Sequence, residues 1–262
     1  MLKFASICPH PPLLIPSIGQ NNLLEIGSTV EAMKKLGDEI KNLEISTIVI
    51  ISPHGPVQMD FMSITGSENL EGNFSQFGDK TFMKFENNLD LGLSIKRIAI
   101  KRKIPTEMVN GNISLDHGAM VPLYFLTEYN PKIKIVPIAF SFLDFQNHFR
   151  FGEVISEAIE NMDERTALIA SGDLSHCLVP GAPVVYSPSG KKFDNLLLNL
   201  LEQNRVGEIL NMDSSLIEEA GECGLRSIII LLGALANTEY KFEKLSYEGP
   251  FGVGYLTGRF VF

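Results

Sequence analysis

Short apolar runs that stop abruptly at polar residues, glycine or proline recur along the chain. Such runs are too short for comfortable helices, and their composition is typical of buried strands. Three of them, residues 2–7, 47–51 and 165–170, are each followed closely by a segment that contains a histidine. Residues 61–64 and 133–140 have a similar composition. The pattern therefore predicts strands at these five places.

Segments with a helical spacing of apolar residues lie between the predicted strands. In residues 23–43 the apolar residues recur every three or four positions, with lysine and glutamate between them. Further helices are predicted near residues 90–100, 145–161, 191–203 and 225–237. Alternating strands and helices are typical of an α/β protein. We therefore expect an α/β fold with a central mixed, largely parallel sheet flanked by helices.

Composition and charge narrow the class of protein. Of the 262 residues, 45% are hydrophobic and 20% are charged, which is typical of a folded protein rather than a disordered one. The net charge of -9 argues against a nucleic-acid partner, since phosphate binding needs clustered lysine and arginine. No apolar stretch reaches the ~20 residues that span a bilayer, so we expect no membrane segment.

The expected organisation is one domain in the cytoplasm. No internal repeat or clear linker divides residues 1–262, and the first residues lack the basic start of a signal peptide. The three cysteines are too few for a disulfide framework, and they lack the spacing of a zinc ribbon. Sparse, unpaired cysteines favour a reducing compartment.

Four of the five histidines lie in loops rich in glycine, proline, aspartate or serine. His10, His54 and His176 follow predicted strands, and His117 lies in a turn before a segment that can open a helix. Ligands of open α/β sheets bind beyond the carboxyl ends of the strands, so we expect these side chains to converge. A single loop histidine is usually only solvated or hydrogen-bonded, whereas four at equivalent places predict a site. His148 follows no strand and is expected to be an ordinary helix-surface or capping residue.

Two histidines alone make a poor metal site, so a carboxylate ligand is sought near them in the sequence. Iron in oxygen-activating enzymes prefers two imidazoles and one carboxylate, with open positions opposite. Glu222, in a glycine-flanked turn before an apolar helix, is the predicted third ligand. The alternative is that Glu222 is a helix N-terminal acid that interacts with the helix dipole. Cys223 is a rival ligand, because a thiolate at the same turn would suit zinc or soft iron.

Six motifs in order resemble the LigB-like superfamily of class III extradiol dioxygenases. They are PHPP at residues 9–12, SPHG at 52–55, LDHG at 115–118, GDLSH at 172–176, ECGLRS at 222–227 and YEGPFGVGY at 247–255. The resemblance covers nearly the whole chain. It is closest to the LigB-like proteins associated with the AmmeMemoRadiSam system, and more remote to the Memo proteins.

The resemblance implies a LigB-like extradiol dioxygenase domain over residues 1–262 that binds Fe(II). Its metal ligands would be His10, His54 and a carboxylate near Glu222, with zinc or another divalent metal as an alternative ion. His117 and His176 would act as catalytic residues on protons rather than on the metal. The expected partners are dioxygen and a small, catechol-type aromatic substrate whose ring is cleaved, and the resemblance favours a homodimer.

The presence of Cys223 beside Glu222 leaves two other functions open. In Memo-like relatives a cysteine stands where Cys223 stands here, and those proteins are not established dioxygenases. One alternative is a metal-binding or peptide-binding scaffold that keeps the fold without ring cleavage. The other is a zinc-dependent hydrolase in which the metal activates water. For the dioxygenase, Asp116 and Asp173 are candidates to orient the imidazoles of His117 and His176, or equally to form turns.

Overall fold

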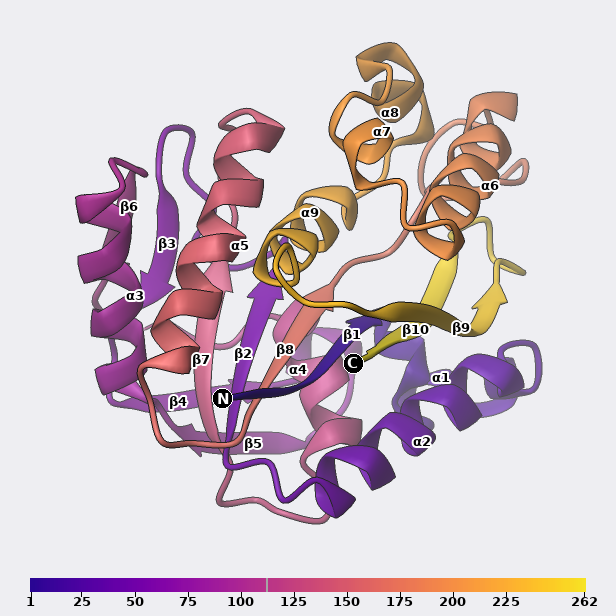
Figure 1. Ribbon diagram of the computed structural model, residues 1–262. Helices are drawn as coiled ribbons and strands as arrows, with labels where there is room; N and C mark the ends of the chain where they lie inside the picture. Colours follow the sequence, from indigo (N-terminus) through magenta and orange to yellow (C-terminus); the bar gives the residue numbers. More distant parts are fainter. Residues whose placement is uncertain (112) are drawn as a thin grey trace.

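A mixed, largely parallel sheet forms the centre of the structure (Figure 1). The structure is a computed structural model that describes residues 1–111 and 113–262. The strands of this sheet are β1 (Leu2–Cys8), β2 (Thr47–Ser52), β3 (Met62–Thr65), β6 (Thr106–Val109), β7 (Lys134–Ala139), β8 (Thr166–Ser171), β9 (Lys241–Glu248) and β10 (Tyr255–Val261). Their order across the sheet is β6-β3-β7-β2-β8-β1-β10-β9. The fold expected from the sequence is thereby confirmed.

The central strands β7, β2, β8 and β1 are parallel neighbours. β2 and β8 are buried at every position, because helices cover both faces of a parallel sheet. The five strands predicted from apolar runs correspond to β1, β2, β3, β7 and β8. Their carboxyl ends therefore bring the segments that follow β1, β2 and β8 to one edge of the sheet.

The strands toward the two edges of the sheet did not emerge from the apolar pattern. β9 and β10 extend the sheet beyond β1 as an antiparallel pair, and β6 pairs with β3 at the other edge. β9 is buried only at Phe242 and Ser246 and contains lysine and glutamate, as is usual for an edge strand. A separate hairpin is formed by β4 (Asn69–Asn73) and β5 (Phe82–Glu86).

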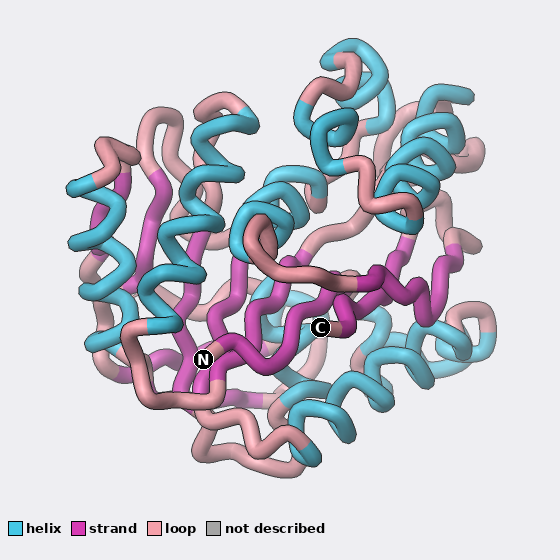
Figure 2. Tube along the Cα trace, in the orientation of Figure 1, coloured by secondary structure: helices cyan, strands magenta, loops and turns pink. Residues whose placement is uncertain are grey.

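Helices cover both faces of the sheet, as Figure 2 shows in cyan. One face packs against α2 (Gly27–Asn42) and α4 (His117–Leu126). The other packs against α3 (Leu89–Lys101), α5 (Phe145–Glu160) and α9 (Leu225–Ala234). The remaining helices are α1 (Pro16–Gly19), α6 (Pro188–Glu202), α7 (Val206–Leu210) and α8 (Ser214–Ala220), with 3-10 turns at Pro12–Leu14, Gln20–Leu24 and Ser75–Phe77. None of the helices in the described part of the chain has the length and apolarity needed to cross a bilayer.

Two glycines let α5 and α9 pack with their backbones in contact. A Cβ atom at Gly152 of α5 would lie 1.9 Å from the carbonyl oxygen of Ile230 in α9. A Cβ at Gly233 of α9 would lie 2.0 Å from the carbonyl oxygen of Phe149. Real Cβ atoms do not tolerate such distances, so glycine is required at both positions. This crossing fixes α9, whose N-terminus lies beside the histidines.

Candidate metal centre

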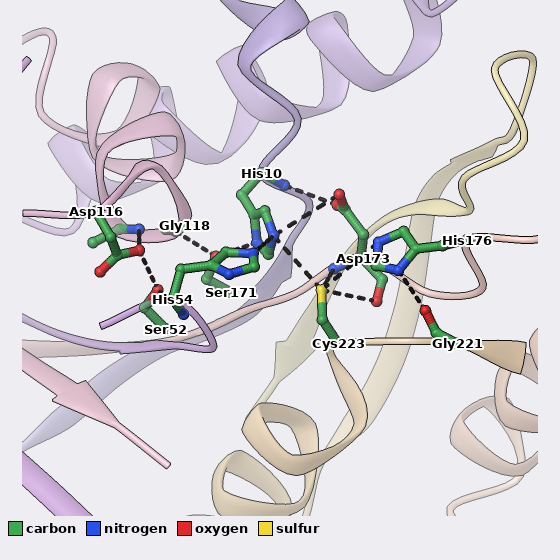
Figure 3. A network of polar contacts seen from close by, with 11 residues as sticks. His10, Ser52, His54, Asp116, Gly118, Ser171, Asp173, His176, Gly221 and Cys223 are labelled. Carbon is green, nitrogen blue, oxygen red and sulfur yellow. Dashed lines mark hydrogen bonds and ion pairs between the residues drawn. The ribbon is translucent and has the colours of Figure 1, made fainter. Parts of the chain in front are cut away.

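His10, His54 and Cys223 bring their ligand atoms together beyond the strand ends (Figure 3). The Nε2 atoms of His10 and His54 are 3.1 Å apart, and the Sγ atom of Cys223 lies 3.6 Å from Nε2 of His10. All three ligand atoms lie within 4.8 Å of one another. His10 follows β1, His54 follows β2, and Cys223 precedes α9. Segments remote in sequence therefore form one group with the spacing of a metal site.

Ser171, the last residue of β8, sets the tautomer of His10. The Nδ1 atom of His10 lies 3.0 Å from Oγ of Ser171, whose hydroxyl donates a hydrogen bond to the carbonyl oxygen of Gly118. Since the serine proton is already used, Nδ1–H of His10 must be the donor to Ser171. The lone pair of Nε2 is then directed toward His54 and Cys223, which is the tautomer that a metal requires. Ser171 was not among the residues predicted from sequence, although its place at the end of a strand before the Gly-Asp segment could have indicated it.

A buried carboxyl group supports His10 from the other side. The backbone N–H of His10 donates to Oδ1 of Asp173 at 3.0 Å, and Oδ2 of Asp173 lies 3.9 Å from Nε2 of His10. Burial raises the pKa of Asp173 to about 7, and burial lowers the pKa of His10 well below its usual value. Both shifts favour the neutral forms and reflect the cost of charge in a buried place. A bound cation would favour the ionised carboxylate instead.

A glycine contact brings Cys223 against Asp173. A Cβ at Gly172 would lie 2.1 Å from Cα of Gly224, so the loop after β8 and the loop before α9 touch at their backbones. In consequence the backbone N–H of Asp173 donates to Sγ of Cys223 at 3.3 Å, and N–H of Cys223 donates to the carbonyl oxygen of Asp173. Burial raises the pKa of the Cys223 thiol well above its usual value. A metal ion at this place would be needed to favour the thiolate.

Glu222 lies next to Cys223 in the chain but takes a different role in the structure. Its carboxylate accepts a hydrogen bond of 2.6 Å from the backbone N–H of Leu225, in the first turn of α9. This is the helix N-terminal arrangement that the sequence left open as the alternative to metal binding. Burial raises the pKa of Glu222 to about 7. Among the described residues, the group that can share an ion contains Cys223 and not Glu222.

His117 and His176 complete the cluster of four histidines. The ring of His117 stacks on that of His54, with centroids 4.3 Å apart, and meets the ring of His10 edge-on at 5.5 Å. Nδ1 of His176 donates to the carbonyl oxygen of Gly221, which leaves its Nε2 as an acceptor 3.9 Å from Sγ of Cys223. Burial lowers the pKa of His117 to about 4 and also lowers that of His176. The predicted convergence of the four histidines is therefore observed.

Asp116 positions the loop after β2 rather than an imidazole. Its Oδ1 atom caps α4 by accepting from N–H of Ala119 at 3.1 Å, and it accepts from the hydroxyl of Ser52 at 2.5 Å. Oγ of Ser52 in turn accepts from the backbone N–H of His54. Asp116 therefore links the start of α4, which carries His117, to the turn that carries His54.

The expectation that His148 occupies a helix surface is wrong. The side chain is fully buried within α5, and both ring nitrogens face carbonyl oxygens. Nδ1 lies 2.7 Å from the oxygen of Asp144, and Nε2 lies 3.0 Å from that of Ser141. Burial lowers the pKa of His148 to about 4, against the effect of the two carbonyls. His148 is a structural residue that holds the segment between β7 and α5.

Residues 4–258 match the family described as the catalytic LigB subunit of aromatic ring-opening dioxygenase. The chain belongs to the LigB family. Within the curated proteins it is 37% identical over 258 residues to protein CA_C1420 of Clostridium acetobutylicum, covering 95% of this chain and 55% of that protein. The chain thus spans about half the length of this relative.

Two further proteins resemble the LigB family member over most of the length of both chains. The chain is 25% identical over 257 residues to 3,4-dihydroxyphenylacetate 2,3-dioxygenase of Escherichia coli, covering 91% of this chain and 92% of that enzyme. A crystal structure of the uncharacterized protein JW3007 from Escherichia coli K12 superposes with a TM-score of 0.69 at 16% identity, covering 98% of each chain. The latter similarity shows the shared fold. The family match and the dioxygenase relative support an extradiol-dioxygenase-like scaffold.

Proposed function

We propose that this LigB family protein is a metal-dependent dioxygenase that opens the ring of a catechol-type substrate with Fe(II) bound. The observation that carries the proposal is the group formed by His10, His54 and Cys223, with ligand atoms within 4.8 Å of one another. The relative that acts on 3,4-dihydroxyphenylacetate supplies the substrate class. We propose Cys223, in place of the expected Glu222, as the third metal ligand.

The donor set fits a divalent metal ion. Two imidazole nitrogens suit iron, zinc and copper alike, whereas a thiolate shifts preference toward the softer ions. Iron of ring-opening enzymes is usually held by two histidines and one carboxylate, so the thiol of Cys223 is a departure from that pattern. The buried carboxyl group of Asp173, 3.9 Å from Nε2 of His10, supplies a nearby oxygen. The residues present therefore suit both zinc and a thiolate-bound iron.

The histidines outside the ligand group are placed to handle protons. A catechol must lose protons before its two oxygens can chelate a metal, and a neutral imidazole within reach can accept them. His117 lies against the ring of His54, and His176 presents its unprotonated Nε2 toward Cys223. We assign His117 and His176 to acid and base roles. An Fe(II) ion held beside them would supply the redox chemistry that ring opening by dioxygen requires.

The test begins with metal content and oxygen consumption. Protein as purified is analysed for iron and zinc, then loaded anaerobically with Fe(II), and oxygen uptake is recorded with catechol and with 3,4-dihydroxyphenylacetate. The expected result is one equivalent of metal per chain and catechol-dependent uptake with formation of a ring-opened product. Stoichiometric Fe(II) without any uptake would overturn the dioxygenase proposal while leaving the metal centre intact.

The thiol of Cys223 specifically favours a second candidate function. A zinc ion held by two histidines and one cysteine, with a fourth position for water, is the composition of some catalytic zinc sites. Such a site polarises a bound water for hydrolysis. Stoichiometric zinc that resists exchange for Fe(II), together with no oxygen uptake, would favour this candidate. The same outcome with no hydrolytic activity would favour the metal-binding scaffold.

A further inference from the structure

Asp194 of α6 is a fully buried acidic residue outside the metal ligand group. Its Oδ1 atom accepts a hydrogen bond of 2.9 Å from the backbone N–H of Ser175, in the loop after β8. Its Oδ2 atom accepts one of 2.5 Å from the phenol hydroxyl of Tyr247 in β9. A carboxylate can be buried without great loss of stability only when its oxygens have such partners. The group is therefore fixed between α6, β9 and the loop after β8.

Gly254 lets this carboxylate approach the backbone before β10. A Cβ atom at Gly254 would lie 2.3 Å from Oδ2 of Asp194 and 3.0 Å from Cβ of Leu174. With glycine there, its N–H donates to the carbonyl oxygen of Ser175, and its carbonyl oxygen accepts from N–H of Leu174, both at 2.8 Å. The segment before β10 and the loop after β8 are thereby held together beside Asp194.

Ser175 is followed in the chain by His176, whose imidazole lies near Cys223 (Figure 3). The backbone N–H of His176 and the hydroxyl of Ser175 both donate to the carbonyl oxygen of Ala220, at 3.1 and 2.9 Å. Nδ1 of His176 donates to the carbonyl oxygen of Gly221, and its Nε2 atom faces Sγ of Cys223 at 3.9 Å. The direction of the imidazole therefore depends on where the backbone at Ser175 lies.

The carboxyl group of Asp194 carries its charge in neutral solution. Burial raises its pKa to about 6, against the effect of the hydrogen bonds from Tyr247 and Ser175. Hydrogen bonds to an ionised acceptor are stronger than those to a neutral one. Among the described residues, no lysine or arginine forms an ion pair with Asp194, so these two bonds hold the charge. An apolar side chain would fill the same place with less loss of stability, which favours a positioning role.

We propose that Asp194 is the positioning residue for His176. Its carboxylate binds the N–H of Ser175, and this bond keeps the loop at the place from which Nε2 of His176 faces Cys223. The inference rests on the proposed function in treating His176 as a residue that transfers protons beside the metal. It adds to the site a residue of α6 that acts through the backbone of the loop.

The tautomer of His176 is the readout of its position. Imidazole ¹⁵N chemical shifts distinguish a protonated from an unprotonated ring nitrogen. They are recorded at about pH 8, where the histidine is neutral. The full chain is used with excess Zn²⁺, a diamagnetic ion, so neither Fe(II) nor dioxygen is needed. His176→Gln assigns the resonances by their absence. Wild type is expected to show the Nδ1–H tautomer alone, and a mixture of tautomers in wild type would overturn the proposal.

Matched variants separate positioning from stability. Asp194→Ala is expected to give a mixture of His176 tautomers, because the loop loses the acceptor at Ser175. Asp194→Asn is expected to restore the single tautomer, since its amide oxygen can accept the same bond. Tyr247→Phe removes the other hydrogen bond of the carboxylate, so it should unfold at lower urea concentration yet retain the single tautomer.

A single tautomer in Asp194→Ala would contradict the positioning role. Equal disturbance in Tyr247→Phe would also contradict it, because lost stability alone would then account for the change. Should Asp194→Ala fail to fold, Gly254→Ala tests the same contact from the other side, since its methyl group displaces Oδ2 of Asp194. A mixture of tautomers is expected in that variant as well, and a single tautomer would refute the proposal.

The positioning role and the dioxygenase proposal can fail separately. If wild type consumes a catechol, Asp194→Ala should keep its metal and lose on the order of 100-fold in kcat, as expected for a misplaced proton-transfer group. A tautomer change without any oxygen uptake by wild type would keep the role of Asp194 and remove the ring-cleavage chemistry. Oxygen uptake with an unchanged tautomer in Asp194→Ala would keep the dioxygenase and remove the role of Asp194.

Discussion

Ser171 holds the imidazole of His10 through a hydrogen bond of 3.0 Å between Oγ and Nδ1. The hydroxyl of Ser171 donates onward to the carbonyl oxygen of Gly118, so the serine accepts from His10 and fixes its tautomer. Partners of this kind orient metal ligands and raise their basicity. The affinity of the centre for metal therefore depends on a residue that does not contact the metal.

Replacing Ser171 with alanine is expected to weaken metal binding roughly 10-fold to 100-fold, because His10 loses its orienting acceptor. Competition with a chelating dye measures the dissociation constant. Ser6→Ala serves as the control, since Ser6 is equally buried on β1 and contacts Cys8 rather than a histidine. Equal metal affinity of Ser171→Ala and wild type would contradict the role given to the serine.

Cys223→Ala is expected to lose the metal, and Glu222→Ala to retain it. The reason is that Cys223 shares the ligand group with His10 and His54, whereas the Glu222 carboxylate accepts from the backbone N–H of Leu225. Loss of that hydrogen bond should cost Glu222→Ala about 1 kcal/mol of stability. Elemental analysis of the purified variants measures the metal, and Cys177→Ala controls for removal of a buried thiol. Metal retained by Cys223→Ala and lost from Glu222→Ala would instead identify Glu222 as the third ligand.

His117→Ala and His176→Ala are expected to keep the metal, whereas His10→Ala and His54→Ala should lose it. Removal of a group that transfers protons typically lowers a rate by ~10²–10⁴-fold, while removal of a direct ligand empties the site. Metal content is measured for all four variants, followed by oxygen uptake with whichever catechol the wild type consumes. Metal loss in His117→Ala or His176→Ala, with retention in His10→Ala, would reverse these roles.

His148 is expected to make the protein less stable as the pH falls. Burial sets its folded-state pKa at about 4, below the ordinary 6.5, so the unfolded chain binds more protons between these values. The free energy of unfolding is therefore highest above about pH 6.5 and declines toward pH 4, with a loss of roughly 2.5 kcal/mol at pH 4.5. Urea unfolding of wild type and His148→Gln at several pH values isolates this contribution, since the other histidines are shared. A gain in stability on acidification, relative to the variant, would mean that the two carbonyls hold a charged imidazole.

Gly152→Ala is expected to destabilise the protein by about 3 kcal/mol or more. The new methyl group would meet the carbonyl oxygen of Ile230 at 1.9 Å, and the helices α5 and α9 would have to move apart. Gly207→Ala in α7 is the matched control, because its methyl group would meet nothing within 4 Å. That control should be neutral or up to ~1 kcal/mol more stable. Similar chemical denaturation midpoints for the two variants would contradict the close packing of α5 and α9.

The order of buried strands and amphipathic helices could be predicted because each depends on local spacing. Parallel strands such as β2 and β8 are apolar at their four central positions, which separates them from the helices and from the polar turns that follow. β9 and β10 could not be found in this way. β9 is buried at only two positions and carries charges, so its pairing with β10 depends on contacts between segments rather than on its own composition.

The convergence of the histidines followed from sequence, because His10 and His54 stand directly after parallel strands whose ends must meet. The choice between Glu222 and Cys223 did not. The two residues are adjacent in the chain, and only the position of α9 directs one side chain to a backbone N–H and the other to the histidines.

Sequence by itself thus determined the fold class and the edge of the sheet at which the site forms, since both depend on the pattern of apolar residues and on chain direction. The tertiary structure decided the ligand group and the tautomer of His10, which Ser171 sets. These features depend on which side chains meet across loops remote in sequence. Close backbone contacts hold these loops together. One of them, between Gly172 and Gly224, lies beside the site.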